Sequence, residues 1–249
     1  MKSHALASVL AVLFISSNVF AQTSPSSSPE TPPWTNESEV GIATVSGNAQ
    51  SETYSGKQTT LYQFDLNKLK LALRYLKTSS RGTDTARSWD GILRYDRVLR
   101  EDLSVFASYG LESDVFAGYV QRNNADVGVH YDIVKTKPTQ WFAEAGYRNT
   151  FTLSRGSSSS DPVAHIIRVY TEVGQELSET SSGRLWVEYL PNVKAGNDAR
   201  LNSEVSLVTQ INSVFALKVG YLVKYQSAPV APATEYLDSF FTTAVVAKF

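Results

Sequence analysis

The chain has 249 residues, and its 23 Lys and Arg nearly balance its 24 Asp and Glu. This balance provides no strong field to attract nucleic acid or an acidic partner. Cysteine is absent, which excludes disulfides, thiolate metal sites, a cysteine nucleophile and a lipoprotein anchor. The mean hydropathy is negative, which still allows a membrane barrel, because only alternate residues of such a barrel face lipid.

The first residues have the features of a secretory signal. Lys2 provides a positive charge, residues 5–15 form an apolar core, and Val-Phe-Ala at 19–21 forms a small-residue cleavage site. The core is shorter than the roughly 18 apolar residues of a membrane-spanning helix, and no later stretch reaches that length. We therefore expect residues 1–21 to be a cleavable signal peptide.

A polar segment separates this signal from the remainder of the chain. Residues 22–33 consist mainly of Ser, Thr and Pro with one charge. Such a composition cannot bury enough apolar surface to fold, so we expect a disordered lead-in in the periplasm. The folded domain is then expected at residues 34–249.

Within this domain, apolar residues alternate with polar or small ones, which is the period of a β-strand. In the stretch 89–96, Trp89 and Tyr95 share one face while Asp90 and Arg94 share the other. The same pattern predicts twelve strands, at 36–45, 50–64, 68–75, 89–96, 103–112, 124–132, 141–148, 167–176, 184–189, 202–207, 215–225 and 241–249.

One of these stretches also allows a helix. The residues that recur there at helical spacing are Leu66, Leu69, Leu73 and Leu76. The period alone does not decide between helix and strand in so short an apolar stretch. The alternation in the following stretches favours a strand.

The connections alternate between compact and long ones, as in bacterial outer-membrane barrels. The compact connections are expected at 65–67, 97–102, 135–139, 178–183 and 211–213. The long ones, rich in Ser, Gly, Pro and Asn, are expected at 78–86, 113–120, 153–162, 191–198 and 227–234. The hairpin at 46–48 is the exception, because it is short where a long loop is expected. We expect both termini and the compact turns in the periplasm, and the long loops outside the cell.

A soluble barrel or sandwich would turn the apolar face of each strand into a core and the charged face to water. Two features favour the inverse. Aromatic residues lie near strand ends, as at Trp141 and Tyr147, which is typical of interfacial girdles. The opposite faces mix both signs of charge with glycine, as Glu144 and Arg148 do beside Gly146, which suits a polar lumen. We therefore predict an all-β fold, a transmembrane antiparallel up-and-down β-barrel of about 12 strands.

The last predicted strand carries an expected assembly signal. Its alternation places Phe241, Val245 and Phe249 on one face. An aromatic that closes an alternating strand resembles the signal by which outer-membrane barrels are recognised for assembly. The expected partners are therefore outer-membrane lipid and the β-barrel assembly machinery, and no nucleic acid.

Several segments in order resemble one known family. They are Trp-Thr-Asn-Glu-Ser-Glu-Val-Gly at 34–41, Ala-Glu-Ala-Gly-Tyr-Arg at 143–148, Glu-Tyr-Leu-Pro-Asn at 188–192 and Leu-Asn-Ser-Glu-Val-Ser-Leu at 201–207. This series resembles the domain of unknown function 481 family, the salt-induced outer-membrane proteins. The resemblance implies a barrel in the outer membrane of a Gram-negative envelope, without established catalytic residues.

Two histidines of the domain could carry chemistry. His130 lies near Asp126 and Asp132, a spacing that allows part of a metal or acid–base site. We favour a lumen histidine hydrogen-bonded to a carboxylate. A barrel phospholipase would need a serine nucleophile near His165, but residue 167 is Ile and the nearby serines, 157–160, fall in an expected loop. We therefore predict no enzyme, no catalytic residue, no metal and no cofactor.

The remaining candidates are charged residues predicted to face the lumen. They are Arg94, Glu112, Glu144, Arg148, Arg168, Glu172, Arg184, Glu188, Arg200 and Glu204. Charged walls can set the selectivity of a channel, whereas paired charges can fill a barrel of this size. Because the two signs are nearly equal, we favour an envelope protein with a charge-paired, narrow or closed lumen, linked to salt or osmotic stress by the family resemblance. A porin-like channel for small polar solutes or ions is the alternative.

Overall fold

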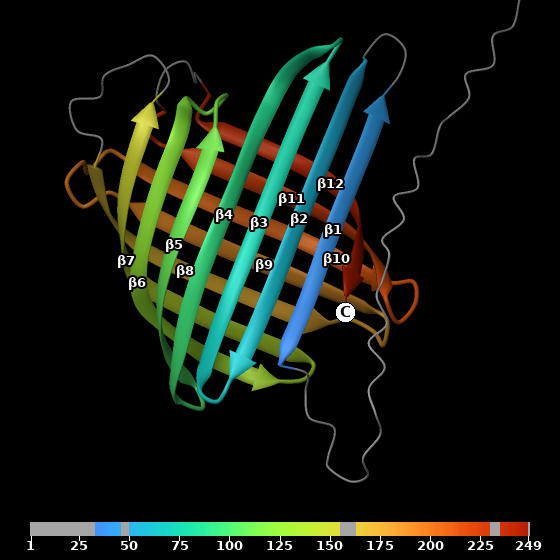
Figure 1. Cartoon of the computed structure of the whole chain (residues 1–249), viewed down its shortest axis with the longest axis vertical. Helices are drawn as coiled ribbons and strands as arrows, with labels where there is room; N and C mark the ends of the chain where they lie inside the picture. Colours follow the sequence, from blue (N-terminus) through green and yellow to red (C-terminus); the bar gives the residue numbers. More distant parts are fainter. Residues whose placement is uncertain (1–32, 46–49, 155–162, 230–234, 249) are drawn as a thin grey trace, which may run out of the picture. The chain divides into compact units, whose positions relative to one another are not determined.

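The computed structural model describes residues 33–45, 50–154, 163–229 and 235–248. They form one sheet of twelve antiparallel strands that closes into a barrel (Figure 1). The strands are β1 (Trp34–Val45), β2 (Ser51–Phe64), β3 (Asn67–Ser80), β4 (Thr83–Arg100), β5 (Leu103–Asp114), β6 (Tyr119–Thr136), β7 (Thr139–Ser154), β8 (Val163–Glu176), β9 (Ser181–Pro191), β10 (Ala199–Gln210), β11 (Phe215–Gln226) and β12 (Leu237–Lys248). The predicted all-β barrel of twelve strands is confirmed. Among the described residues, no helix is long and apolar enough to cross a membrane.

Each strand pairs with its neighbours in sequence, and β1 pairs with β12 to close the ring. The stretch 66–76, where helix and strand were both possible, belongs mainly to β3. The predicted signal peptide, the lead-in up to residue 32, the hairpin at 46–48 and Phe249 of the expected assembly signal lie outside the described residues.

Two predicted long loops are wrong, because the one expected at 113–120 is reduced to residues 115–118 between β5 and β6 and the other is absent. Residues 78–86 were expected to form a long connection, but β3 and β4 continue through them to a tight turn at Arg81 and Gly82, whose φ angles are 50° and 77°. The extended hairpin is held by polar contacts, such as the 3.1 Å ion pair between Lys77 and Asp84. Because its side chains are polar on both faces, this part of the hairpin shows no alternation of apolar and polar residues.

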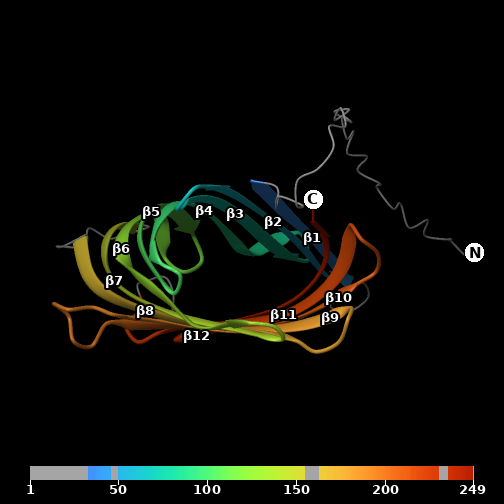
Figure 2. The ribbon, with the colours of Figure 1, turned by 90° about the horizontal axis from the view of Figure 1, so that it is seen from below.

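The barrel is apolar outside and charged inside. Leu71, Val127 and Val205 are exposed on the outer face, whereas Glu144 and Arg168 are buried on the inner one. A water-soluble barrel has the opposite distribution, so these exposed apolar side chains are suited to lipid. Seen from below, the ring of strands is flattened, with β2–β5 on one side and β8–β12 on the other (Figure 2).

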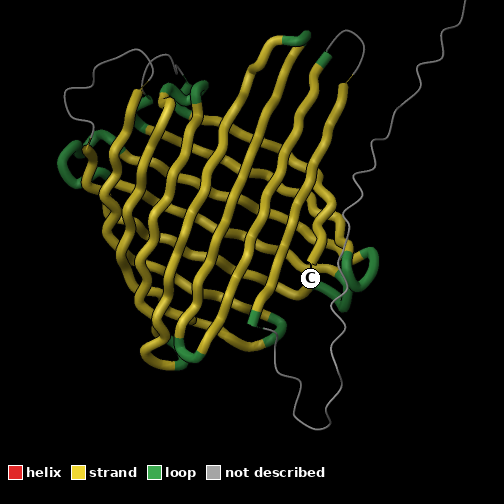
Figure 3. Tube along the Cα trace, in the orientation of Figure 1, coloured by secondary structure: helices red, strands yellow, loops and turns green. Residues whose placement is uncertain are grey.

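The contact between the first and last strands is short. In the described residues, β1 and β12 share four registered pairs, from Glu37↔Lys248 to Val40↔Val245. By comparison, β2 and β3 share fourteen. The contact therefore lies near the C-terminal end of β12, beside the mark C in Figure 3. We call this contact the seam.

Candidate functional site: the charged lumen

All ten charged residues that the sequence assigned to the lumen lie on the inner face of β4, β5 and β7–β10. Their positions follow from the antiparallel registers, which place Arg94 opposite Ser108 and Arg148 opposite Asp126. Nine of the ten form ion pairs. Arg200 is the exception: within the described part of the chain it has no ion-pair partner.

Glu144 on β7 is the centre of the paired charges. Its Oε1 accepts hydrogen bonds from Arg94 Nη2 at 2.7 Å and contacts His130 Nδ1 at 3.0 Å. Its Oε2 accepts from Arg94 Nη1 at 3.0 Å and from Arg168 Nη1 at 2.6 Å. Only 3% of the Glu144 side chain is exposed. Two guanidinium groups therefore compensate one deeply buried carboxylate.

Arg94 reaches Glu144 over two intervening strands, β5 and β6. Its guanidinium lies 4.0 Å from the centroid of the Phe106 ring. That ring lies against Gly128, where an added Cβ would be 2.7 Å from Phe106 Cζ and 2.9 Å from Gly146 Cα. Glycines on the inner wall thus make room for an aromatic ring, and the ring supports the cation through a cation–π contact.

The pairing continues from β7 to β10. Arg168 Nε donates to Glu188 Oε1 at 2.7 Å. Arg148 donates to both carboxylate oxygens of Asp126, at 2.7 and 2.8 Å, and to Glu188 at 3.5 Å. Asn202 Nδ2 donates to the other oxygen of Glu188 at 3.1 Å. We call this connected set, together with Arg94, Glu144 and His130, the lumen network.

A second cluster joins the strands at the seam. Lys57 Nζ on β2 and Lys218 Nζ on β11 both donate to Glu39 on β1, at 2.8 and 3.0 Å. Lys218 also lies 3.3 Å from Glu204, which in turn is 3.5 Å from Arg184. Glu39, Lys57 and Lys218 are not among the lumen charges predicted from the sequence. Glu39 could have been predicted from the alternation of β1. Val40 faces outward, so the side chain of the residue before it faces the lumen.

The sequence of the chain matches the family model described as "Protein of unknown function, DUF481" over residues 38–249. The chain belongs to this family. No curated protein matches it. The membership in the domain of unknown function 481 family that the sequence segments indicated is thereby confirmed.

Solved structures similar to this DUF481 barrel are outer-membrane proteins. A NanC porin is 8% identical, with a TM-score of 0.50, over 86% of this chain and 97% of the porin. OmpT of Vibrio cholerae is 7% identical, with a TM-score of 0.45, over 87% and 96% of the two chains. The translocator domain of the autotransporter NalP from Neisseria meningitidis is 10% identical, with a TM-score of 0.46, over 89% of each. At such identities the likeness to the porin concerns the fold alone.

The histidines of the DUF481 barrel lie in different surroundings. His130 is in the lumen, between Glu144 and Asp132, and its Nε2 lies 3.2 Å from Asp132. Asp126 instead pairs with Arg148. His165 is on β8, where its ring contacts the hydroxyl of Tyr147, and the serines at 157–160 lie outside the described residues. In the described ranges, no group of three or more His, Cys, Asp or Glu is arranged to hold a metal ion.

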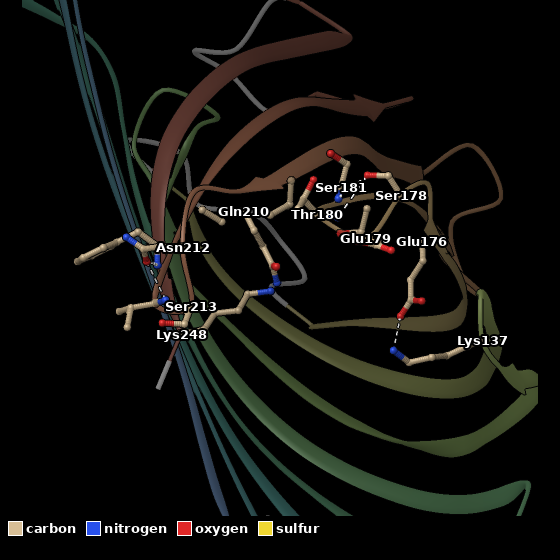
Figure 4. A pocket seen from close by; sticks show the side chains of 15 residues that line it. Lys137, Glu176, Ser178, Glu179, Thr180, Ser181, Gln210, Asn212, Ser213 and Lys248 are labelled. Carbon is tan, nitrogen blue, oxygen red and sulfur yellow. Dashed lines mark hydrogen bonds and ion pairs between the residues drawn. The ribbon is translucent and has the colours of Figure 1, made fainter.

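The DUF481 barrel has a wide polar cavity at the end where the compact turns lie. Its volume is about 460 Å³, and it is lined by the turns between β6 and β7, β8 and β9, and β10 and β11 (Figure 4). An ion pair of 2.9 Å between Lys137 and Glu176 lies at its edge. Hydroxyl and amide side chains, such as those of Ser181 and Gln210, form about half of the lining, which contains no His or Arg. We call this cavity the vestibule.

Proposed function

We propose that this protein is an outer-membrane barrel whose lumen is held narrow by ion pairs, and that it supports the envelope without freely conducting solutes. The link between Arg94 on β4 and Glu144 on β7 carries this proposal, because it spans two intervening strands inside the barrel. Buried ion pairs can hold a structure in one specific arrangement even where their net stabilisation is small. The lumen network would hold the inner wall from β4 to β10 in this way.

The proposal includes export by the signal at residues 1–21 and a role under salt or osmotic stress. The role under salt or osmotic stress is proposed from the family resemblance of the sequence. No enzymatic activity is proposed. His130 lies between two carboxylates, and His165 contacts a tyrosine hydroxyl.

Conductance of the chain from Gln22 onward, refolded and inserted in a planar bilayer, tests the proposal. Folding is first verified by the heat-dependent shift in electrophoretic mobility that is usual for barrels. We expect no stable conductance steps from the folded protein. Arg94→Ala, which removes the link over β5 and β6, should produce steps, whereas Arg100→Ala, at the end of β4 and with a side chain 65% exposed, should not. Stable, salt-dependent steps from the unaltered protein would contradict the proposal.

A channel for small polar solutes or ions is the second candidate. One observation favours it: the charged side chains of Lys57, Arg74 and Arg184 are 29%, 37% and 35% exposed within the lumen. Water therefore reaches part of the inner wall. If the protein conducts, Arg148→Glu and Arg168→Glu should change its ion selectivity, since fixed charges in a narrow pore set the local ion concentration.

A further inference from the structure

A second cavity lies inside the barrel beside the seam. Its volume is about 80 Å³, and residues of β1–β4 and β10–β12 line it. A cavity of this size has room for several water molecules, since one water needs only about 10–15 Å³ of such space. A tetrahedral oxyanion therefore also fits. We call this cavity the seam cavity.

Its lining contains more cations than carboxylates. The cations are Lys57, Arg74, Lys218 and Lys224, and the carboxylates are Glu39 and Glu204. Both carboxylates are already shared, Glu39 between Lys57 and Lys218 and Glu204 between Lys218 and Arg184. Arg74 pairs with Asp90, to which its Nε donates at 2.6 Å.

Lys224 is the cation of the lining that has no carboxylate at ion-pair distance within the described residues, although Glu112, Asp114 and Asp90 act on it from farther away. Among the described residues it forms no ion pair and no hydrogen bond, and its Nζ lies 5.8 Å from the centroid of the Phe240 ring. The acidic residue registered opposite it on β12, Asp238, is exposed and forms no ion pair with it. A half-buried ammonium without a hydrogen-bond acceptor in contact is unfavourable, and an anion in the cavity would provide one.

The neutral groups of the cavity suit the same ligand. Ser88 and Thr242 contribute hydroxyls, which can donate to an oxyanion, while Leu222 and Ala244 provide apolar surface. Polar groups that converge on a cavity with partly apolar walls are typical of small-ligand sites.

We propose that the seam cavity binds a phosphate-type oxyanion, with Lys224 and Arg74 as its principal charged contacts. The anion can arrive free, through the lumen, or as the head group of an anionic lipid. The second source is compatible with the seam, because β1 and β12 have no registered pairs in their described residues beyond Val40↔Val245. Binding of an anion in the seam cavity does not require the lumen to conduct. This proposal therefore goes beyond the proposed function.

Calorimetric titration of the whole exported chain in detergent with inorganic phosphate tests the first source. We expect saturable binding that weakens at least tenfold in Lys224→Gln and is restored in Lys224→Arg. Lys137→Gln is the matched control, because Lys137 is 80% exposed at the vestibule and its loss should leave binding unchanged.

Reconstitution in phosphatidylcholine vesicles with and without phosphatidylglycerol tests the second source. Native mass spectrometry then measures how much phosphatidylglycerol the barrel retains. Retention that Lys224→Gln abolishes, without binding of free phosphate, assigns the site to a lipid head group. If neither probe binds, or if Lys224→Gln binds both as the unaltered protein does, the proposal is wrong.

A footprint on the unaltered protein covers the case in which Lys224→Gln does not fold. Chemical acetylation of lysines is mapped by mass spectrometry with and without each probe. Phosphate or phosphatidylglycerol should slow acetylation of Lys224 severalfold and leave Lys137 unaffected. Equal rates at Lys224 with and without both probes would overturn the proposal.

Discussion

Replacing Glu144 by Gln should destabilise the barrel strongly. The side chain is 3% exposed and accepts hydrogen bonds from two guanidinium groups, those of Arg94 and Arg168. Gln keeps the shape but removes the charge, so both cations lose a partner while remaining in the lumen. Breaking one side of a buried ion pair costs about 3–5 kcal/mol. Arg94 retains Asp96 and Arg168 retains Glu188, so we expect the lower end, about 3 kcal/mol.

The assay is urea unfolding of the barrel in phospholipid vesicles, followed by tryptophan fluorescence. Asp102→Asn is the matched control, because Asp102 pairs with Arg100 at 3.4 Å on an exposed turn. Such an exposed pair contributes about 0–1 kcal/mol. If Glu144→Gln lowers the unfolding free energy no more than the control does, the lumen network does not brace the barrel.

A double-mutant cycle separates the individual contacts. The pair Glu144→Gln and Arg94→Gln should show a coupling of about 1–3 kcal/mol, as expected for residues that contact each other in one network. Additive effects of the two changes would show that the link over β5 and β6 is not formed in the membrane.

Three further predictions concern the wall, the lipid face and the seam. Gly128→Val should destabilise the barrel by about 1–3 kcal/mol through overpacking, because its Cβ would lie 2.5 Å from the Ala145 carbonyl oxygen. Gly56→Val is the control and should be tolerated, because an added Cβ there meets open space. Equal unfolding midpoints of the two variants would refute the close packing at Gly128. Leu71→Arg should lower the unfolding free energy in vesicles by about 2–4 kcal/mol if the residue lies at the middle of the membrane. Leu66→Arg, at a turn, should lower it by only about 0–1 kcal/mol. Similar losses in the two variants would argue against this placement in the bilayer. Those amide hydrogens of residues 41–43 that point away from β2 should exchange faster than amides in the middle of β3, because registered pairing to β12 ends before them while pairing to β2 continues. Equal protection would show a longer seam.

Which side chains face the lumen and which face outward could be predicted, because the alternation within a single strand is enough to assign its two faces. Trp89, Leu93 and Tyr95 mark the outer face of β4 and thereby place Arg94 inside. The choice of partner could not be predicted in the same way. That Arg94 finds Glu144 depends on the curvature of the wall and on space left by Gly128, neither of which is a local property of β4.

The seam cluster was missed for a different reason. Lys57 lies in a stretch that is polar on both faces, so alternation gave no clear inward side. Lys57 meets Lys218 only because the first and last strands close the ring. Residues 78–86 resemble a loop in sequence, because their side chains are polar on both faces of the hairpin. Apolar residues therefore do not alternate with polar ones there.

The short seam also affects how the barrel forms and where it opens. In a closed sheet, parting two neighbouring strands breaks the backbone hydrogen bonds between them, and among the described residues the fewest registered pairs join β1 and β12. These strands are also the first and last of the barrel in the chain, so the ring closes only after every other strand has been delivered. The contact between β1 and β12 can thus form only when both ends of the sheet are present, and we expect it to open most easily. A foreign strand that exchanges with this barrel would enter at the same edge.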